Sequence, residues 1–306
     1  MQSSAGKFLR KMVAQRYLIL MSFPFVIWVI VFSYIPLWGW TMAFQNYKPG
    51  RGFFEQQWVG LDQFRALFTD RNFIPVMRNT LAMSVLGLVL GFFIPILFAI
   101  VLNEVKSVSF KKASQTISYL PHFVSWVVAA NIVTVMLSNE GPINNLLLSL
   151  GLVDKPIAFM MNKHAFWFIV VFADIWKETG WNAIIYLAAI SGIDQEQYEA
   201  ARVDGAHRLR QIWHITLPGI KPTIVVLLIL SIGSLINIGF ERQLLLGNSM
   251  VIDYSMVLDQ YALKYGIDMN RYSFGTAIGI FKSVVSVILL LGTNWIARKF
   301  DQGAVF

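Results

Sequence analysis

Six long apolar stretches alternate with short polar segments along this chain. Each has about the 20 mainly apolar residues that a helix needs to cross the hydrocarbon core of a bilayer. Because the stretches are continuous rather than alternating, they favour helices over a β-barrel. They cover residues 17–44, 79–102, 113–138, 164–190, 221–241 and 272–297. The pattern predicts an all-α integral membrane protein, with a basic tail at residues 1–16 and one transmembrane domain of six helices at residues 17–300.

Composition and charge agree with lipid as the solvent. Of the 306 residues, 56% are hydrophobic and only 14% are charged, and the net charge is +8. The basic residues gather at one set of chain segments, so they predict cytoplasmic N- and C-termini by the positive-inside rule rather than nucleic-acid binding. These residues are Lys7, Arg10, Lys11, Arg16, Lys106, Lys111, Lys112, Arg202, Arg208, Arg210, Lys221, Arg298 and Lys299.

Two chemistries are missing from the chain. It has no cysteine, which excludes disulfides and thiolate metal sites, and no other metal site is predicted. It also lacks the glycine-rich loop ending in Gly-Lys-Ser/Thr that cradles a nucleotide phosphate. We therefore expect no catalytic residue and no cofactor bound by this chain, and any energy for its function would come from another subunit.

A charged segment at residues 194–218 separates the fourth and fifth apolar stretches. It predicts a helix at residues 194–203, a chain reversal at Gly205, and a second short helix at about residues 206–214. Thr216 is expected to cap the next span, and Pro218 fits the first turn of that span.

The surface of this elbow is partly small and partly apolar. Ala200, Ala201 and Gly205 would let another backbone approach closely. An apolar face for burial would come from Leu209, Ile212 and Trp213. By spacing alone, an ordinary amphipathic connector lying on the lipid headgroups fits this pattern equally well.

Polar residues inside three of the apolar stretches form helical stripes. Such residues are costly in lipid, so they normally face a bundle interior or a cavity. We predict that the stripes meet at one substrate cavity near the midplane of the membrane. The first stripe is Asp174, Lys177, Glu178 and Trp181, the second is Ser231, Ser234 and Asn237, and the third, after a kink at Pro121, is His122, Ser125 and Trp126.

Structural roles compete with binding at several of these positions. Lys177 can pair with Asp174, serines and asparagines can join helices by hydrogen bonds, and His122 fits a satisfied interior histidine as well as a ligand contact. Lys282, in the sixth stretch, can pair with either Asp174 or Glu178, and the sequence does not decide between them.

The elbow carries a motif with several fixed positions. Glu199-Ala200-Ala201, then Gly205, then Ile215-Thr216-Leu217-Pro218 resemble the Glu-Ala-Ala loop of ABC importer permeases, at the family spacing and before the penultimate span. Other segments resemble the carbohydrate-uptake branch, in particular the oligosaccharide permeases that work in pairs. They are Tyr198, Asp204-Gly205-Ala206, Trp58-Val59-Gly60-Leu61 and Gly141-Pro142-Ile143-Asn144.

This resemblance implies a type I permease fold in the bacterial cytoplasmic membrane. It implies a transport subunit that is not itself an enzyme, with a second related permease, an extracellular solute-binding protein and an ABC ATPase dimer that holds ATP and Mg²⁺. The substrate would be an oligosaccharide, including acidic, pectin-derived ones. The elbow would dock on the ATPase through Glu199, Ala200, Ala201, Asp204, Gly205, Leu209 and Pro218.

The residues at membrane depth suit a sugar. Trp126, Trp176 and Trp181 could stack on the C–H faces of sugar rings. Lys177 with His122 favours an acidic sugar, although Glu178 could neutralise the lysine. The chain departs from related permeases here, since it has charges where they often carry neutral groups.

Two alternative functions stay open at this point. One is an ABC permease for a non-sugar solute. The other is an ion-coupled secondary transporter, in which Asp174, Lys177 and Glu178 would carry protons or ions. The secondary transporter would need inverted repeats, which the sequence does not display, and it leaves the elbow unexplained.

Overall fold

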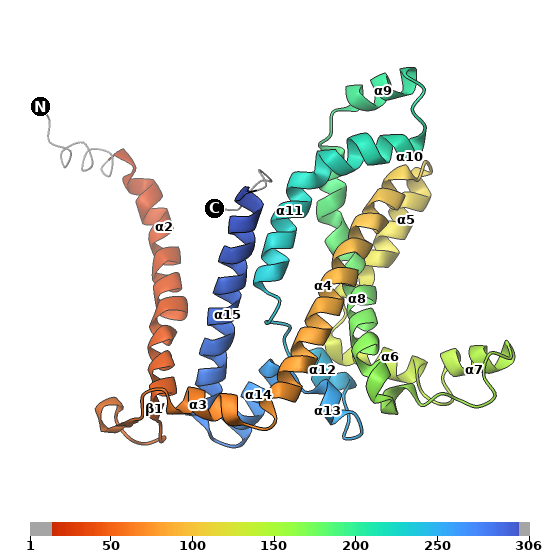
Figure 1. Cartoon of the computed structure of the whole chain (residues 1–306). Coiled ribbons are helices and arrows are strands. Elements are labelled where there is room, and N and C mark those ends of the chain that lie inside the picture. The colour runs from red at the N-terminus through yellow and green to blue at the C-terminus, as the bar shows by residue number, and fades with distance from the viewer. Residues whose placement is uncertain (1–13, 300–306) are drawn as a thin grey trace, which may run out of the picture.

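The computed structural model describes residues 14–299, and nearly all of the regular structure there is helical. The first span begins with α2 (Arg16–Val29) and continues through a π-helical turn at Ile30–Tyr34 and a 3₁₀ segment at Ile35–Phe44. It stands apart from the other helices in Figure 1, with none of its apolar window buried. Only its last segment packs against α15 (Tyr272–Lys299). This span is therefore an apolar rod that needs lipid or another protein around it.

Four long helices form the rest of the bundle. They are α4 (Phe73–Glu104), α8 (Lys163–Ser191), α11 (Leu217–Gly233) and α15. The pair α4 and α8 has the most extensive contact, and α11 lies beside α8 and α15. The apolar stretches of the sequence form these helices because every backbone N–H and C=O is then bonded within its own segment.

Among the described residues, four helices are long and apolar enough to cross a membrane, or five if one bent pair counts as a single span. α8 has sufficient length, but every membrane-length window of it contains Asp174, Lys177 and Glu178. The prediction of a helical membrane protein is thus confirmed at this coarser level.

Shorter elements complete the chain. A two-residue antiparallel ladder pairs β1 (Gln45–Asn46) with β2 (Gln57–Trp58), with Gln45 opposite Trp58 and Asn46 opposite Gln57. The remaining elements are β1 (Gln45–Asn46), β2 (Gln57–Trp58), α3 (Asp62–Thr69), α5 (Val108–Tyr119), α6 (Trp126–Met136), α7 (Pro142–Ser149), α9 (Gln195–Val203), α10 (Arg208–Gln211), α12 (Glu241–Leu246), α13 (Ile252–Ser255) and α14 (Leu258–Leu263), with 3₁₀ turns at Phe53–Glu55, Leu120–Phe123 and Phe159–Met161 and π-helical turns at Ile212–Thr216 and Lys264–Asp268.

The third apolar stretch is not one helix. α5 ends near Pro121, a short 3₁₀ turn follows, and α6 starts at Trp126 after a bend of 107°. Proline lacks an N–H and clashes with the preceding turn, which explains a break at this point. The predicted kink is confirmed, but the single helix at residues 113–138 is wrong.

The helix of the fifth apolar stretch ends earlier than predicted. α11 ends at Gly233, and residues 234–240 have no regular helix before α12 begins. Gly239 has a positive φ of 73°, a conformation that a residue without Cβ adopts without strain. The predicted helix at residues 221–241 therefore ends eight residues early.

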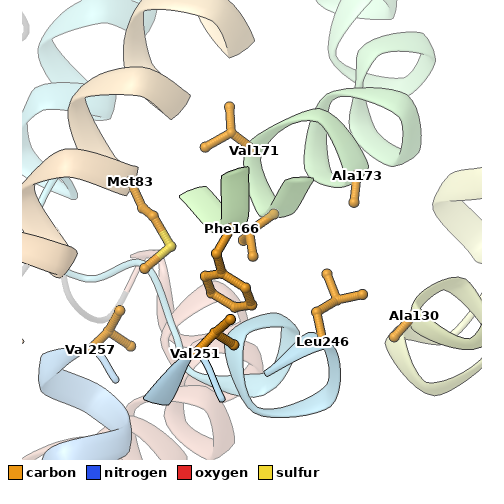
Figure 2. Close-up of a cluster of buried hydrophobic side chains, with 9 residues drawn as sticks. Met83, Ala130, Phe166, Val171, Ala173, Leu246, Val251 and Val257 are labelled. Carbon is orange, nitrogen blue, oxygen red and sulfur yellow. The ribbon is translucent and has the colours of Figure 1, made fainter. Parts of the chain in front are cut away.

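A buried apolar cluster closes one end of the bundle. Figure 2 shows Phe166 of α8 between Met83 of α4 and the side chains of Val251 and Val257, which come from the segments around α13. Phe166, Val251 and Val257 are fully buried. The cluster fixes α4, α8 and the region between α12 and α14 relative to one another, and this region bounds the candidate site.

A close contact between α5 and α8 makes a prediction. A Cβ atom on Gly180 would overlap the backbone carbonyl of Ser118. We expect Gly180→Ala to cost about 1–3 kcal/mol of stability, the usual range for overpacking a tight contact. Thermal unfolding of the detergent-solubilised protein measures this loss. Gly279→Ala is the control, because its Cβ would meet nothing within 4 Å, and an equal loss in both variants would contradict the prediction.

Candidate functional site

A cavity of about 280 Å³ lies between α4, α8 and the end of α11. Residues from two of the predicted stripes line it: Asp174 and Glu178 on α8, and Ser231, Ser234 and Asn237 on or after α11. Its wall also includes Met83, Ser84, Gly87, Leu88, Gly91, Phe92, Ile175, Thr179, Asn182, Leu235, Ile238 and Arg242. The cavity therefore combines two carboxylates, one guanidinium and several neutral hydrogen-bonding groups.

The cation of the cavity is Arg242, near the start of α12. Its guanidinium forms an ion pair with Asp174, and its Nη2 donates to the carbonyl of Ile238 at 3.2 Å. Within the described part of the chain, the buried Nε of Arg242 has no hydrogen-bond partner. The structural alternative that paired Lys177 with Asp174 is wrong, because Arg242 reaches the carboxylate from a segment that the sequence placed outside the span.

A second polar group lies beside the cavity and centres on Glu178. Its Oε2 lies 2.7 Å from Nδ1 of His122, and its Oε1 accepts a hydrogen bond of 3.0 Å from Nζ of Lys177. Nζ of Lys177 also donates to the carbonyl of His122 at 2.7 Å. The 3₁₀ turn that contains Pro121 leaves this carbonyl free to accept the bond. The lysine is only 5% exposed and is not one of the residues that line the cavity.

The aromatic side chains of the stripes frame this group. The ring of Trp181 stacks on His122 with a centroid distance of 4.4 Å and an angle of 2°. Nζ of Lys177 lies 5.6 Å from the centroid of Trp126. Trp126 also lines a neighbouring hollow of about 480 Å³ with Ile238 and Arg242, two residues that the cavity shares.

The residues of the predicted stripes thus fall into two groups, one that lines the cavity and one that lies beside it. Asp174, Glu178, Ser231, Ser234 and Asn237 reach the cavity, whereas His122, Lys177, Trp126 and Trp181 pack around Glu178 or beside Arg242. Ser125 caps α6, since its Oγ accepts a hydrogen bond of 3.4 Å from the N–H of Val128.

Some lining residues were missed from sequence. Asn182 follows Glu178 by four residues and Asp174 by eight, so the helical spacing would have found it. Arg242 carries no such signal, because it lies beyond an apolar stretch whose helix ends early.

Lys282 pairs with Asp259 on α14, and with neither Asp174 nor Glu178.

The first half of the elbow, a helix followed by a chain reversal, forms as the sequence predicts. Asp194 caps α9, its Oδ1 accepting a hydrogen bond of 3.0 Å from the N–H of Glu196. At the other end the N–H of Gly205 donates to Arg202 O at 3.1 Å, and the N–H of Ala206 donates to Ala201 O at 2.8 Å. This pair of bonds is the Schellman motif, and Gly205 has the positive φ, 75°, that the motif needs.

The second half of the elbow differs from the prediction. α10 does not stop at residue 214 but continues through a π-helical turn into α11, so residues 208–233 form one helix. Thr216 lies inside this helix and caps nothing. It is buried, and its Oγ1 lies 2.9 Å from the hydroxyl of Tyr198 on α9. Pro218 does sit in the first turn of α11.

The outer surface of the elbow is uncovered in the described chain. Glu199, Ala200, Asp204 and Gly205 are exposed, and Ala201 is half-buried. The predicted apolar face is present but mostly open, since Leu209 and Trp213 are 65% and 68% exposed. Large open apolar side chains on a charged surface indicate a place where another protein or a membrane surface binds.

The elbow lies at one end of the bundle. In Figure 1, α9 and α10 lie at the top with the last turns of α4, and α3, α7, α12 and α13 lie toward the bottom. The N-terminal end of α2 and the C-terminal end of α15 point toward the same end as the elbow. Arg208 joins α10 to the end of α4 through a 3.2 Å ion pair with Glu104.

Comparisons with known proteins identify this arrangement. Residues 91–304 match the binding-protein-dependent transport system inner membrane component family. Protein LplB of Bacillus subtilis (strain 168) is 44% identical over 99% of this chain and 96% of its own length. The polygalacturonan/rhamnogalacturonan transport system permease protein YteP of the same organism is 43% identical, over 98% and 93%.

A solved structure has the same fold. It is the crystal structure of a bacterial ABC transporter involved in the import of the acidic polysaccharide alginate. One of its chains has a TM-score of 0.87 and 39% identity, covering 96% of this chain and 99% of that chain. The chain therefore belongs to the family of inner membrane components of binding-protein-dependent transport systems.

Proposed function

We propose that this chain is one of two permease subunits of an ATP-driven importer for an oligosaccharide. In this proposal it has six spans with both termini in the cytoplasm. It works with a second related permease, an extracellular solute-binding protein, and an ATPase dimer that holds ATP and Mg²⁺ and carries out hydrolysis. Family membership and the transport proteins named among its relatives support the assignment.

The observation that carries the proposal is the continuity of the helix at residues 208–233. One end of this helix belongs to the exposed elbow, and the other carries Ser231 in the wall of the cavity. At 1.5 Å per residue, the two are about 35 Å apart along the path of this helix, which bends between α10 and α11 in Figure 1. A displacement of the elbow by a closing ATPase dimer would therefore reach the cavity wall through one continuous helix.

Alternating access follows from this linkage. The outward-open and inward-open states would differ in the position of α11 relative to α4 and α8. Binding of the loaded solute-binding protein outside and of ATP inside shifts the population toward the outward-open state, and hydrolysis releases it. The basic side chains of Arg202, Arg208 and Arg210 at the elbow end support its assignment to the cytoplasm.

The relatives that transport polygalacturonan and alginate support an acidic sugar as substrate, and the cavity offers one cation for its carboxylate. Arg242 is the cation on the cavity wall, and its Nε is without a partner among the described residues. A uronate carboxylate could take this free N–H and compete with Asp174 for the guanidinium. Lys177, buried behind Glu178, would hold that carboxylate in place rather than touch the sugar itself.

The remaining groups suit the neutral parts of a sugar. Ser231, Ser234, Asn237 and Asn182 offer hydroxyl and amide groups for sugar hydroxyls. Trp126, next to Arg242, offers an aromatic face for a ring. The cavity of about 280 Å³ is at the small end for a ligand site. In this proposal the second permease forms the facing wall and completes the binding volume.

Coupling through the elbow can be tested with Gly205→Glu. A residue with Cβ opposes the positive φ, so the Schellman turn should distort and the docking surface should shift. In the reconstituted complex we expect the ATPase activity stimulated by loaded binding protein, and uptake, to fall at least about tenfold, because a misdocked ATPase loses more than about 1.4 kcal/mol of coupling.

The matched control is Gly151→Glu. Gly151 also has a positive φ and an open Cβ position, but it lies in the loop after α7, at the opposite end of the bundle. Uptake by this variant should stay near the parent value. Normal coupling in Gly205→Glu would contradict the elbow's role, and uphill uptake without any ATPase subunit would exclude the importer itself.

The charge role of Arg242 can be tested with Arg242→Gln. Loss of a charge-assisted hydrogen bond is worth about 1.5–3 kcal/mol, so uptake of an acidic oligosaccharide should fall about 10- to 100-fold. Uptake of a neutral oligosaccharide of equal length should fall much less. Lys112→Met is the control, because it removes an exposed cation of α5 that does not line the cavity. Its uptake of both sugars should stay near the parent value, and equal losses for the two sugars in Arg242→Gln would contradict the role of Arg242.

A further inference from the structure

The non-helical segment at residues 234–240 is an unusual wall for a cavity. Its residues Ser234, Leu235, Asn237 and Ile238 all line the cavity, and only the first two have N–H groups bonded back to α11. A backbone without its own ladder of hydrogen bonds must be held by its neighbours. The question is which neighbours hold it.

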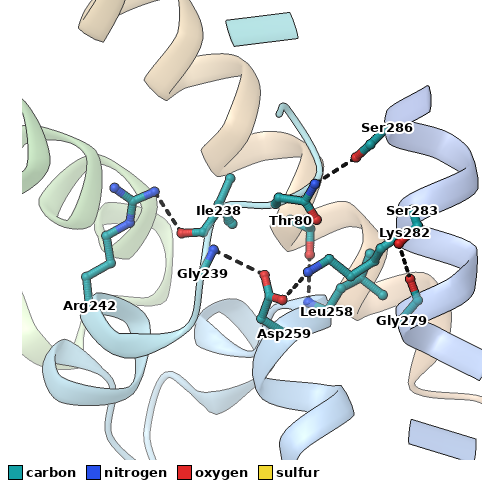
Figure 3. A network of polar contacts seen from close by, with 11 residues as sticks. Thr80, Ile238, Gly239, Arg242, Leu258, Asp259, Gly279, Lys282, Ser283 and Ser286 are labelled. Atoms are coloured by element: carbon teal, nitrogen blue, oxygen red, sulfur yellow. Dashed lines mark hydrogen bonds and ion pairs between the residues drawn. The ribbon is translucent and has the colours of Figure 1, made fainter. Parts of the chain in front are cut away.

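Contacts from other elements fix this segment, and Figure 3 shows most of them. The N–H of Gly239 donates to Oδ2 of Asp259 at 3.1 Å, and the carbonyl of Ile238 accepts from Arg242. Nδ2 of Asn237 donates to Oγ of Ser286 on α15 at 2.7 Å. The bond from Gly239 differs from the others because its acceptor is a carboxylate, and charge-assisted bonds of this kind are the stronger ones.

Asp259 is itself held from two sides. Its Oδ1 forms an ion pair with Nζ of Lys282, which lies in the apolar helix α15 and is only 8% exposed. The N–H of the preceding Leu258 donates to Oγ1 of Thr80 on α4 at 3.0 Å, and Thr80 is fully buried. One carboxylate therefore joins α15 to the segment at Gly239, and the turn that carries it is anchored on α4.

Neither Lys282 nor Asp259 lines the cavity. A buried lysine in a membrane helix is costly unless it is paired, and the same pairing could have been made without any contact to the cavity wall. Here the second carboxylate oxygen of Asp259 accepts a hydrogen bond from the backbone N–H of Gly239. Gly239 lies at the end of the segment that lines the cavity, three residues before Arg242.

We propose that Asp259 is a positioning residue that sets the substrate selectivity of the cavity, with Lys282 as the counter-ion of its carboxylate. The side-chain oxygen at position 259 holds the N–H of Gly239, and this contact places Asn237, Ile238 and Arg242 for the sugar. The inference rests on the proposed importer function and deepens it, because it assigns the geometry of the recognition wall to a pair outside the cavity.

A purely structural ion pair makes a different prediction. If the pair only ties α14 to α15, its loss would lower stability and reduce uptake of every sugar in the same proportion. If Asp259 positions the wall through Gly239, loss of the acceptor oxygen would change the ratio of acidic to neutral oligosaccharide uptake. The selectivity ratio is therefore the informative measurement.

Two charge-neutral double variants separate these roles. Lys282→Met with Asp259→Asn removes the ion pair but keeps an amide oxygen that can accept from Gly239. Lys282→Met with Asp259→Leu removes the pair and the acceptor, with a side chain of similar size. Neither variant leaves an unpaired buried charge, so both avoid the main reason for a failure to fold.

The experiment uses the whole complex in proteoliposomes, with acidic and neutral oligosaccharides of equal length. We expect the Asn double variant to keep the selectivity ratio within about twofold of the parent, and the Leu double variant to change it about tenfold, as expected for loss of one charge-assisted contact. Lys282→Arg, which retains the charge, should keep the parent ratio. Lys299→Met, at the far end of α15, is the control for loss of a lysine.

The outcomes are distinct. Equal ratios in the two double variants, whether both normal or both changed, would overturn the positioning role. If the Leu double variant alone does not assemble, the ratio of the Asn double variant decides: a parent ratio supports the proposal, and a changed one overturns it. If the parent complex itself takes up neither sugar and shows no stimulated ATPase activity, the proposed function fails instead.

Discussion

Charged side chains inside apolar helices must find partners, and this requirement organises the site. Asp174, Lys177 and Glu178 on α8 would be costly in lipid or in an apolar interior if they stayed unpaired. Asp174 pairs with Arg242, while Glu178 pairs with both Lys177 and His122. Each pairing brings a different segment against α8: the start of α12 in the first case, and the kink between α5 and α6 in the second. The cavity is the space that these pairings leave beside α4.

The same principle explains how unwound backbone is tolerated within the bundle. Irregular backbone at membrane depth is stable only where protein or a water-filled space satisfies its polar groups. The freed carbonyl of His122 is bonded by Lys177, and the N–H of Gly239 is bonded by Asp259. In the third and fifth apolar stretches, ionisable side chains therefore bond the peptide groups that the helix breaks leave free. These peptide groups lie at the cavity or near it.

One continuous helix links the cavity to the exposed elbow. α10 and α11 form one helix through a π-helical turn, with Thr216 buried against Tyr198 of α9 at the junction. This contact holds α9 against the helix at the junction. A continuous helix with an open apolar face at one end and a polar cavity wall at the other is what the proposed drive by a separate ATPase requires.

Much of this could be predicted from the sequence, because the signals were local. Apolar length identified the membrane class, the spacing of Asp174 and Glu178 placed both on one helix face, and the glycine at position 205 marked the reversal of the elbow. The elbow motif also identified the family. Each of these depends on residues within a few turns of one another, where helix geometry alone fixes the arrangement.

The tertiary structure decided which charges pair, because partners distant in sequence are chosen by packing. Arg242 reaches Asp174 only because α11 ends at Gly233 and the chain turns back toward α8. Lys282 meets Asp259 rather than either carboxylate on α8, and Lys177 lies buried behind Glu178. A helix pattern states which face a residue occupies, but the element that meets this face is determined by the fold.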